Sequence, residues 1–70
     1  MSKTIRARAL RILERKVSES GWIRRGRYFK PALQANVRCY PGLAGIIVET
    51  RGEKGCAWLA REMTLEEFTR

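Results

Sequence analysis

Residues 22–30 hold the densest mixture of basic and aromatic side chains in the chain. They include Trp22, Arg24, Arg25, Arg27, Tyr28, Phe29 and Lys30. Arginine forks bind phosphate oxygens in pairs, aromatic faces stack on nucleobases, and Gly26 lets backbone amides approach a ligand closely. These residue types at this spacing favour recognition of nucleic acid. The alternative is an edge strand that its charges protect from aggregation, with the three aromatic rings packed beneath a helix.

A second group of cations lies on a segment with helical periodicity. In residues 4–19, six apolar side chains fall within an arc of about 160° at 100° per residue, namely Ile5, Ala9, Leu10, Ile12, Leu13 and Val17. Arg8, Arg11 and Arg15 share the opposite side of this expected helix. That stripe is either a phosphate-binding surface or a solvated face on which Arg11 pairs with Glu14.

The two segments together define one candidate surface for nucleic acid or for a protein partner. Its residues are Arg8, Arg11, Arg15, Trp22, Arg24, Arg25, Arg27, Tyr28 and Lys30. Whether Trp22, Tyr28 and Trp58 belong to the core or to the contact surface stays open in the sequence.

The charge distribution points to an acidic partner. The first thirty residues carry ten Lys and Arg against two Glu, whereas the remaining forty carry five against five, so the net charge of +8 lies in the N-terminal part. Charge this concentrated repels itself, and an acidic partner compensates the repulsion. Nucleic acid is the commonest partner of this kind, followed by an acidic protein surface or anionic lipid.

The residues that most catalytic and metal sites require are missing. The chain has no His, and all seven of its acidic residues are Glu. A cysteine nucleophile needs a base or an electropositive pocket, and Arg38 beside Cys39 supplies only a weak form of one. We expect Cys39 and Cys56 to be free, partly buried thiols. The sequence therefore predicts no enzymatic activity, no cofactor and no metal site.

The expected location is the cytoplasm, without a membrane partner. The basic N-terminal segment runs directly into the helical pattern and does not resemble a secretory signal. The longest apolar stretch, residues 43–48, is far too short to span a bilayer. A chain of 70 residues buries only about 60% of its unfolded surface, so self-association would be an ordinary way to add stability.

The local patterns predict one α+β domain over residues 1–70. An N-terminal helix should pack its Ile5, Ile12 and Leu13 face on a small antiparallel sheet, and a capping box at residues 64–67 should start a short C-terminal helix. The other expected elements are a turn and short strand at 22–30, an extended segment at 34–39, a turn at 40–42, a strand at 45–50, a hairpin loop at 51–55 and a partner strand at 56–63.

Several short motifs follow one another in the order found in a known family. They are residues 9–12 (ALRI), 26–28 (GRY), 41–43 (PGL), 49–51 (ETR) and 58–65 (WLAREMTL). In these motifs the chain resembles the YeeT-like family of short uncharacterised proteins carried on enterobacterial prophage-like islands. Residues 17–23 depart from the family pattern. The resemblance implies an accessory protein of a phage or other mobile element, with a role against host defence such as CRISPR or restriction systems.

Two functions remain after this reading of the sequence. In the first, a small non-catalytic protein binds nucleic acid through its N-terminal arginine-rich face. In the second, the protein is an inhibitor of a host defence system, anti-CRISPR or antirestriction, and docks on an acidic surface of a nucleic-acid-handling complex. Charge alone supports the first, whereas the second depends on the family resemblance.

Overall fold

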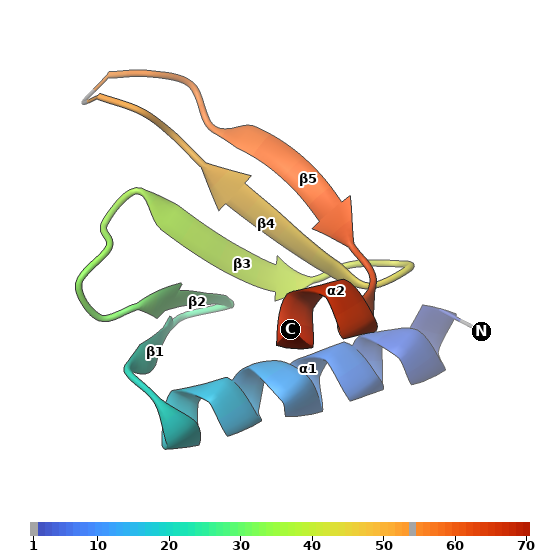
Figure 1. Cartoon of the computed structure of the whole chain (residues 1–70). Coiled ribbons are helices and arrows are strands. Elements are labelled where there is room, and N and C mark those ends of the chain that lie inside the picture. The colour runs from blue at the N-terminus through green and yellow to red at the C-terminus, as the bar shows by residue number, and fades with distance from the viewer. Residues whose placement is uncertain (1, 54) are drawn as a thin grey trace.

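The computed structural model describes residues 2–53 and 55–70 and has the α+β architecture that the sequence predicts (Figure 1). A long N-terminal helix is followed by an antiparallel sheet of five strands in the order β1-β2-β3-β4-β5 and by a short helix. The elements are α1 (Ser2–Glu19), β1 (Trp22–Arg25), β2 (Tyr28–Pro31), β3 (Val37–Pro41), β4 (Ile46–Thr50), β5 (Leu59–Met63) and α2 (Leu65–Thr69).

The core lies between the sheet and the helices. Ala9 and Leu13 of α1 are fully buried against Phe29, Cys39 and Ile46 of three successive strands. The register pairs Phe29 with Cys39, so their side chains project from the same face of the sheet. The expected helix face is confirmed, with Ile5 and Ile12 half-buried beside Leu13, but the strands packed most closely against α1 are β1 and β3.

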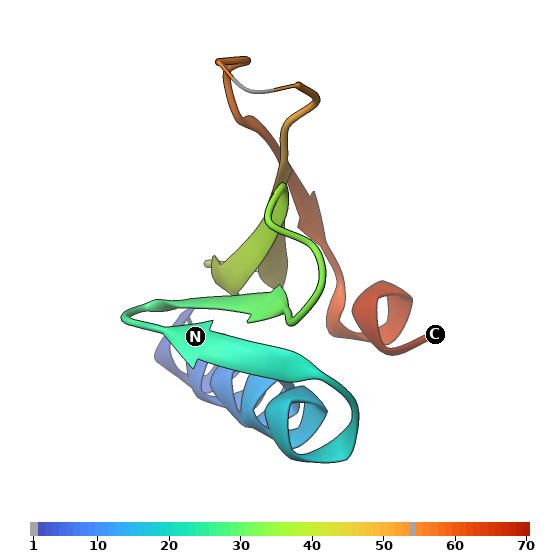
Figure 2. The same cartoon turned by 90° about the vertical axis from the view of Figure 1, so that its left-hand side faces the viewer.

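The short helix α2 covers the same side of the sheet as α1. Its Phe68 meets the ring of Trp22 edge to face at a centroid distance of 5.6 Å. The predicted capping box is confirmed, because the Thr64 hydroxyl accepts the Glu67 amide at 3.1 Å and the Glu67 carboxylate accepts the Thr64 amide at 3.1 Å. Both helices therefore pack on one face, and the β4–β5 hairpin extends away from them (Figures 1 and 2).

The segment 22–30 forms a hairpin rather than a turn followed by one strand. Strands β1 and β2 pair from Trp22↔Pro31 to Arg25↔Tyr28 around a loop of two residues. Gly26 at its first position has a φ of 58°, whereas Arg27 does not have a positive φ, which is the pattern of a type II′ turn. A single glycine thus turns a basic segment into two paired strands.

Two other boundaries differ from the sequence prediction. The expected turn at 40–42 is wrong, because β3 continues through Pro41 and the chain turns at residues 42–45, closed by the Gly42 amide donating to the Gly45 carbonyl at 2.8 Å. The β4–β5 register ends at Thr50↔Leu59, so the connecting segment is residues 51–58 rather than 51–55. Trp58 consequently lies before β5 and not within it.

Within residues 2–53 and 55–70, no helix has the length and apolar character needed to cross a membrane.

Candidate functional site

The side of the sheet opposite both helices carries a group of basic and aromatic residues. We call this side the open face. Because neighbours along a strand alternate between faces, the partners Arg25 and Tyr28 point away from the core that contains Phe29. Arg38 and Tyr40 flank buried Cys39 in β3 and therefore share this side. The basic and aromatic residues at this face are Arg25, Arg27, Tyr28, Lys30, Arg38, Tyr40, Arg51 and Trp58.

Five of these side chains form a ladder in which cations and rings alternate. We call it the aromatic–cation ladder, and it runs Arg27, Tyr28, Arg38, Trp58, Arg51. The guanidinium carbon of Arg38 lies 4.7 Å from the ring centre of Tyr28 and 3.9 Å from that of Trp58. Contacts of this kind contribute about 0.5–2 kcal/mol each. They therefore help to hold the segment that contains Trp58 against β2 and β3.

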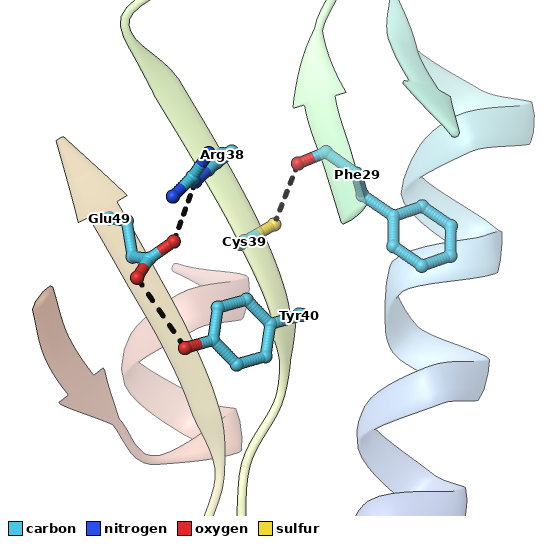
Figure 3. Close-up of polar contacts among 5 residues, drawn as sticks. All are labelled: Phe29, Arg38, Cys39, Tyr40 and Glu49. Atoms are coloured by element: carbon cyan, nitrogen blue, oxygen red, sulfur yellow. Dashed lines mark hydrogen bonds and ion pairs between the residues drawn. The ribbon is translucent and has the colours of Figure 1, made fainter. Parts of the chain in front are cut away.

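Glu49 of β4 fixes the central cation of the ladder. Its Oε1 lies 2.6 Å from Nε of Arg38, and its Oε2 accepts the Tyr40 hydroxyl at 3.5 Å (Figure 3). The Glu49 side chain is only 14% exposed, so solvent screens this pair less than it screens a surface pair. Burial, followed by the nearby Glu49 charge, raises the pKa of Tyr40 above its usual value, which keeps its hydroxyl protonated as a donor.

The open face is hollowed beside the ladder. One hollow of about 200 Å³ is lined by Arg25, Tyr28, Lys30, Ala35, Arg38 and Trp58. A neighbouring depression of about 300 Å³ lies where this face meets α1, because its lining combines Arg6 of α1 with Arg27, Tyr28, Tyr40 and Pro41. Tyr28 forms part of both walls, and each hollow combines aromatic rings with guanidinium or ammonium groups.

Four of the nine candidate residues lie on the open face, namely Arg25, Arg27, Tyr28 and Lys30. Neighbouring Arg24 points to the helix side instead, where its guanidinium lies 3.9 Å from Glu14 and 5.4 Å from the Phe29 ring centre. Glu14 thus pairs with Arg24 and not with Arg11, the partner considered in the alternative interpretation of the helix stripe.

The remaining candidates do not join the open face. Trp22 packs against the core and Phe68, so this ring belongs to the core and not to the contact surface. Arg8 and Arg15 line shallow grooves against α2 that also contain Glu66. Arg11 is exposed on α1, which covers the other side of the sheet. The nine residues do not form one surface, because the sheet separates the helix stripe from the open face.

Four contributors to the open face were missing from the sequence interpretation, namely Arg38, Tyr40, Glu49 and Arg51. The signal for the first two was present, because Arg38 and Tyr40 alternate with Val37 and Cys39 in a strand that is half buried. No local pattern brings Arg51 and Trp58 beside Arg38, since that contact depends on the pairing of β3 with β4.

The two cysteines differ in their surroundings. Cys39 is fully buried and its thiol donates to the Phe29 carbonyl at 3.5 Å (Figure 3). Burial raises the pKa of Cys39 to about 12, more than the nearby Lys16 charge lowers it, so its thiol stays protonated at neutral pH. The prediction that both are partly buried is wrong for Cys56, which is exposed. Among the residues that the structure describes, no three His, Cys, Asp or Glu side chains gather as metal ligands would.

Comparison with known proteins assigns no family to the chain. No family model matches it, no curated protein matches it, and no solved structure matches it. The resemblance to the YeeT-like family therefore stays a prediction from the short motifs.

Proposed function

We propose that this protein binds nucleic acid, without catalysis, through the open face of its sheet. The observation that carries the proposal is the gathering of cations and aromatic rings on one side of the sheet, brought together from β1, β2, β3 and the segment after β4. Nucleic acid matches both kinds of side chain, because its phosphate groups suit the cations and its bases suit the aromatic rings.

Three cations of the open face are not neutralised by a carboxylate of the described residues and can therefore bind phosphates. Arg25 and Arg27 are exposed and Lys30 is half-buried, and in the described part of the chain none of them lies within ion-pairing distance of a carboxylate. Arg38 differs, because Glu49 already neutralises it. Arg25, Arg27 and Lys30 are therefore the residues that we assign to phosphate contacts.

The helix stripe is the weaker candidate for the same role. Arg8 and Arg15 share their grooves with Glu66, whose charge opposes an approaching phosphate, and no aromatic ring lines these grooves. The stripe fits the alternative interpretation of a solvated helix face. We therefore move the proposed interface from the nine sequence candidates to the open face.

Two triple variants with the same change in charge test this assignment. The open-face variant is Arg25→Gln, Arg27→Gln, Lys30→Gln, and the helix variant is Arg8→Gln, Arg11→Gln, Arg15→Gln. Each phosphate contact contributes about 0.7–0.9 to the slope of log affinity against log salt, so the open-face variant should flatten that slope by about two to three units. The helix variant should leave it nearly unchanged. Fluorescence anisotropy with a labelled oligonucleotide at several salt concentrations measures both slopes.

Two results would contradict the proposal. Absence of binding by the unaltered protein at low salt would remove nucleic acid as the partner. Equal flattening by both triple variants would show that charge matters without regard to its position, as in non-specific attraction to a basic protein.

A protein target is the second candidate, and one feature favours it. Leu33, in the turn between β2 and β3, is 98% exposed and lies two residues from Ala35 on the rim of the smaller hollow. An exposed leucine is apolar and does not suit a phosphate surface, whereas Trp, Tyr and Arg, which line the hollow, are the residue types that most often anchor protein interfaces. In this case the protein would belong to a phage or other mobile element and would inhibit a defence complex of the host, as the family resemblance implies.

Leu33→Ser separates the two candidates. A nucleic-acid interface should bind oligonucleotides with unchanged affinity after this substitution. A protein interface should lose a stoichiometric partner that the unaltered protein retains from nuclease-treated host lysate. Retention of that partner by the Leu33→Ser protein would argue against Leu33 as an anchor.

A further inference from the structure

The smaller hollow of the open face has the size and lining of a site for one flat ring. Its volume of about 200 Å³ is below the range of about 300–1,000 Å³ that holds drug-sized ligands. Two of its six lining residues are aromatic, and the others include two arginines and a lysine. A single nucleobase with its phosphate combines the same chemistry, a flat π-system joined to an anion.

Arg38 orders the two aromatic rings of this hollow before a ligand arrives. Its guanidinium carbon lies 4.7 Å from the ring centre of Tyr28 and 3.9 Å from that of Trp58. Cation–π contacts of this kind stabilise both rings in their observed positions. Rings that are already ordered lose less conformational entropy when a base packs against them, which lowers the entropic cost of binding.

The cations at the rim of the hollow suit the backbone of the same nucleotide. Arg25 and Lys30 line the hollow together with Tyr28, and neither has a carboxylate within ion-pairing distance in residues 2–53 and 55–70. Because Arg25 and Lys30 line the same hollow as Trp58, a base packed against Trp58 would lie beside these cations. Rings and charges are therefore arranged for one nucleotide rather than for a phosphate alone.

A double helix cannot use such a site. The bases of a duplex are stacked on each other and offer only their edges in the grooves, whereas unpaired bases can turn their π-faces to a protein. We infer that the hollow lined by Tyr28, Arg38 and Trp58 takes one unpaired base, so that the preferred ligand is single-stranded DNA or RNA. The inference rests on the proposed function and narrows it to one class of nucleic acid.

Intrinsic fluorescence provides a test because the chain has only two tryptophans. Trp22→Phe, a conservative change in the core, leaves Trp58 as the only indole. This protein is titrated with a 12-nucleotide oligo(dT), with a 12-nucleotide oligo(rU) and with a DNA hairpin of equal phosphate number whose loop is a non-nucleotide linker, so that every base is paired. Labelled copies of the same ligands report binding by anisotropy. The single strands should quench Trp58, and the hairpin should bind more weakly without quenching it.

Substitution of Trp58 supplies the second measurement. Stacking of one base contributes about 1–3 kcal/mol, which corresponds to roughly a 5- to 150-fold loss of single-strand affinity in Trp58→Ala. Hairpin affinity should change little in that variant. Trp58→Phe keeps a stacking face and should retain most of the single-strand affinity, which separates loss of stacking from loss of folding.

The outcomes separate this inference from the proposed function. Equal affinity for the hairpin and the single strands, or binding of single strands without quenching of Trp58, would overturn the inference and leave the proposed function standing. Absence of binding to all three ligands at low salt would overturn both. A preference of oligo(rU) over oligo(dT), or the reverse, with quenching in both cases would support the inference and identify the favoured sugar.

Discussion

Replacing Glu49 by Gln should weaken the fold and strengthen nucleic-acid binding at the same time. Glu49 is the carboxylate that pairs with Arg38 at 2.6 Å and accepts the Tyr40 hydroxyl at 3.5 Å. It is also a negative charge on the face that we propose to meet phosphates. The two roles predict changes of opposite sign, which few other substitutions in this chain would produce.

The loss of stability follows from the exposure of the pair. The Arg38 and Glu49 side chains are 29% and 14% exposed, between the surface pairs that contribute about 0–1 kcal/mol and the buried pairs whose disruption costs about 3–5 kcal/mol. Because glutamine still accepts a hydrogen bond, we expect a loss of about 1–2 kcal/mol. In a domain of this length each kcal/mol shifts Tm by about 4–8 °C, so Tm should fall by about 4–16 °C.

The gain in affinity follows from the released charge. Without the negative charge of Glu49, Arg38 is no longer neutralised and its remaining N–H donors can contact a phosphate, which adds about 0.7–0.9 to the slope of log affinity against log salt. Affinity should therefore rise most at low ionic strength and converge with that of the unaltered protein at high salt.

Glu19→Gln provides the matched control for Glu49→Gln. It changes the net charge by the same amount at an exposed position at the end of α1, away from the open face. Thermal unfolding by circular dichroism and anisotropy titrations at several salt concentrations should show the two changes for Glu49→Gln alone. A rise in affinity of the same size for Glu19→Gln, or a fall in affinity for Glu49→Gln, would refute the reasoning.

Three further outcomes concern the fold. Burial raises the pKa of Cys39 from 9.0 to about 12, so between these pH values the thiol ionises in the unfolded chain but not in the folded protein. The free energy of unfolding should therefore fall as pH rises through this range, by up to about 1.4 kcal/mol per pH unit. Urea unfolding at several pH values should show a shallower fall for Cys39→Ala. Thr64→Ala removes the N-cap of α2 and should lower Tm by about 4–8 °C at pH 7. Hydrogen bonds from Thr64 lower the pKa of Glu67, so this part of the stability is present above pH 4.5 and is lost in acid, and the Tm difference should shrink at pH 3. A Cβ at Gly45 would overlap a backbone carbonyl of β5, so Gly45→Ala should cost about 2 kcal/mol or more by urea unfolding, whereas Gly52→Ala, with no atom closer than 3.9 Å, should be nearly neutral.

Local signals in the sequence were sufficient for the elements whose physics is local. The 3.6-residue period of residues 4–19, the capping box at Thr64 and the β-branched run before Thr50 each correspond to an observed element. Gly21, with a φ of 70°, follows α1 in the left-handed conformation that glycine favours. Each of these patterns depends on residues within one or two turns of chain.

The candidate surface could not be predicted in the same way because it depends on strand register. Arg24 and Arg25 are adjacent in the sequence, yet one meets Glu14 beside α1 and the other lines a hollow on the opposite side of the sheet. The type II′ turn at Gly26 fixes which of them faces which side, since a shift of one residue would exchange the two faces. A cluster in the sequence is therefore split in space.

The grouping of charges on the folded surface also differs from their grouping along the sequence. Residues beyond position 30 are neutral as a group, yet Arg38 and Arg51 bring two of their cations into the aromatic–cation ladder with Trp58. Conversely, Arg24 belongs to the basic segment but pairs with Glu14. The pairing of β3 with β4 thus builds a basic face from both halves of the chain, and it places Glu49 where one carboxylate both holds the central arginine and limits the charge available to a phosphate.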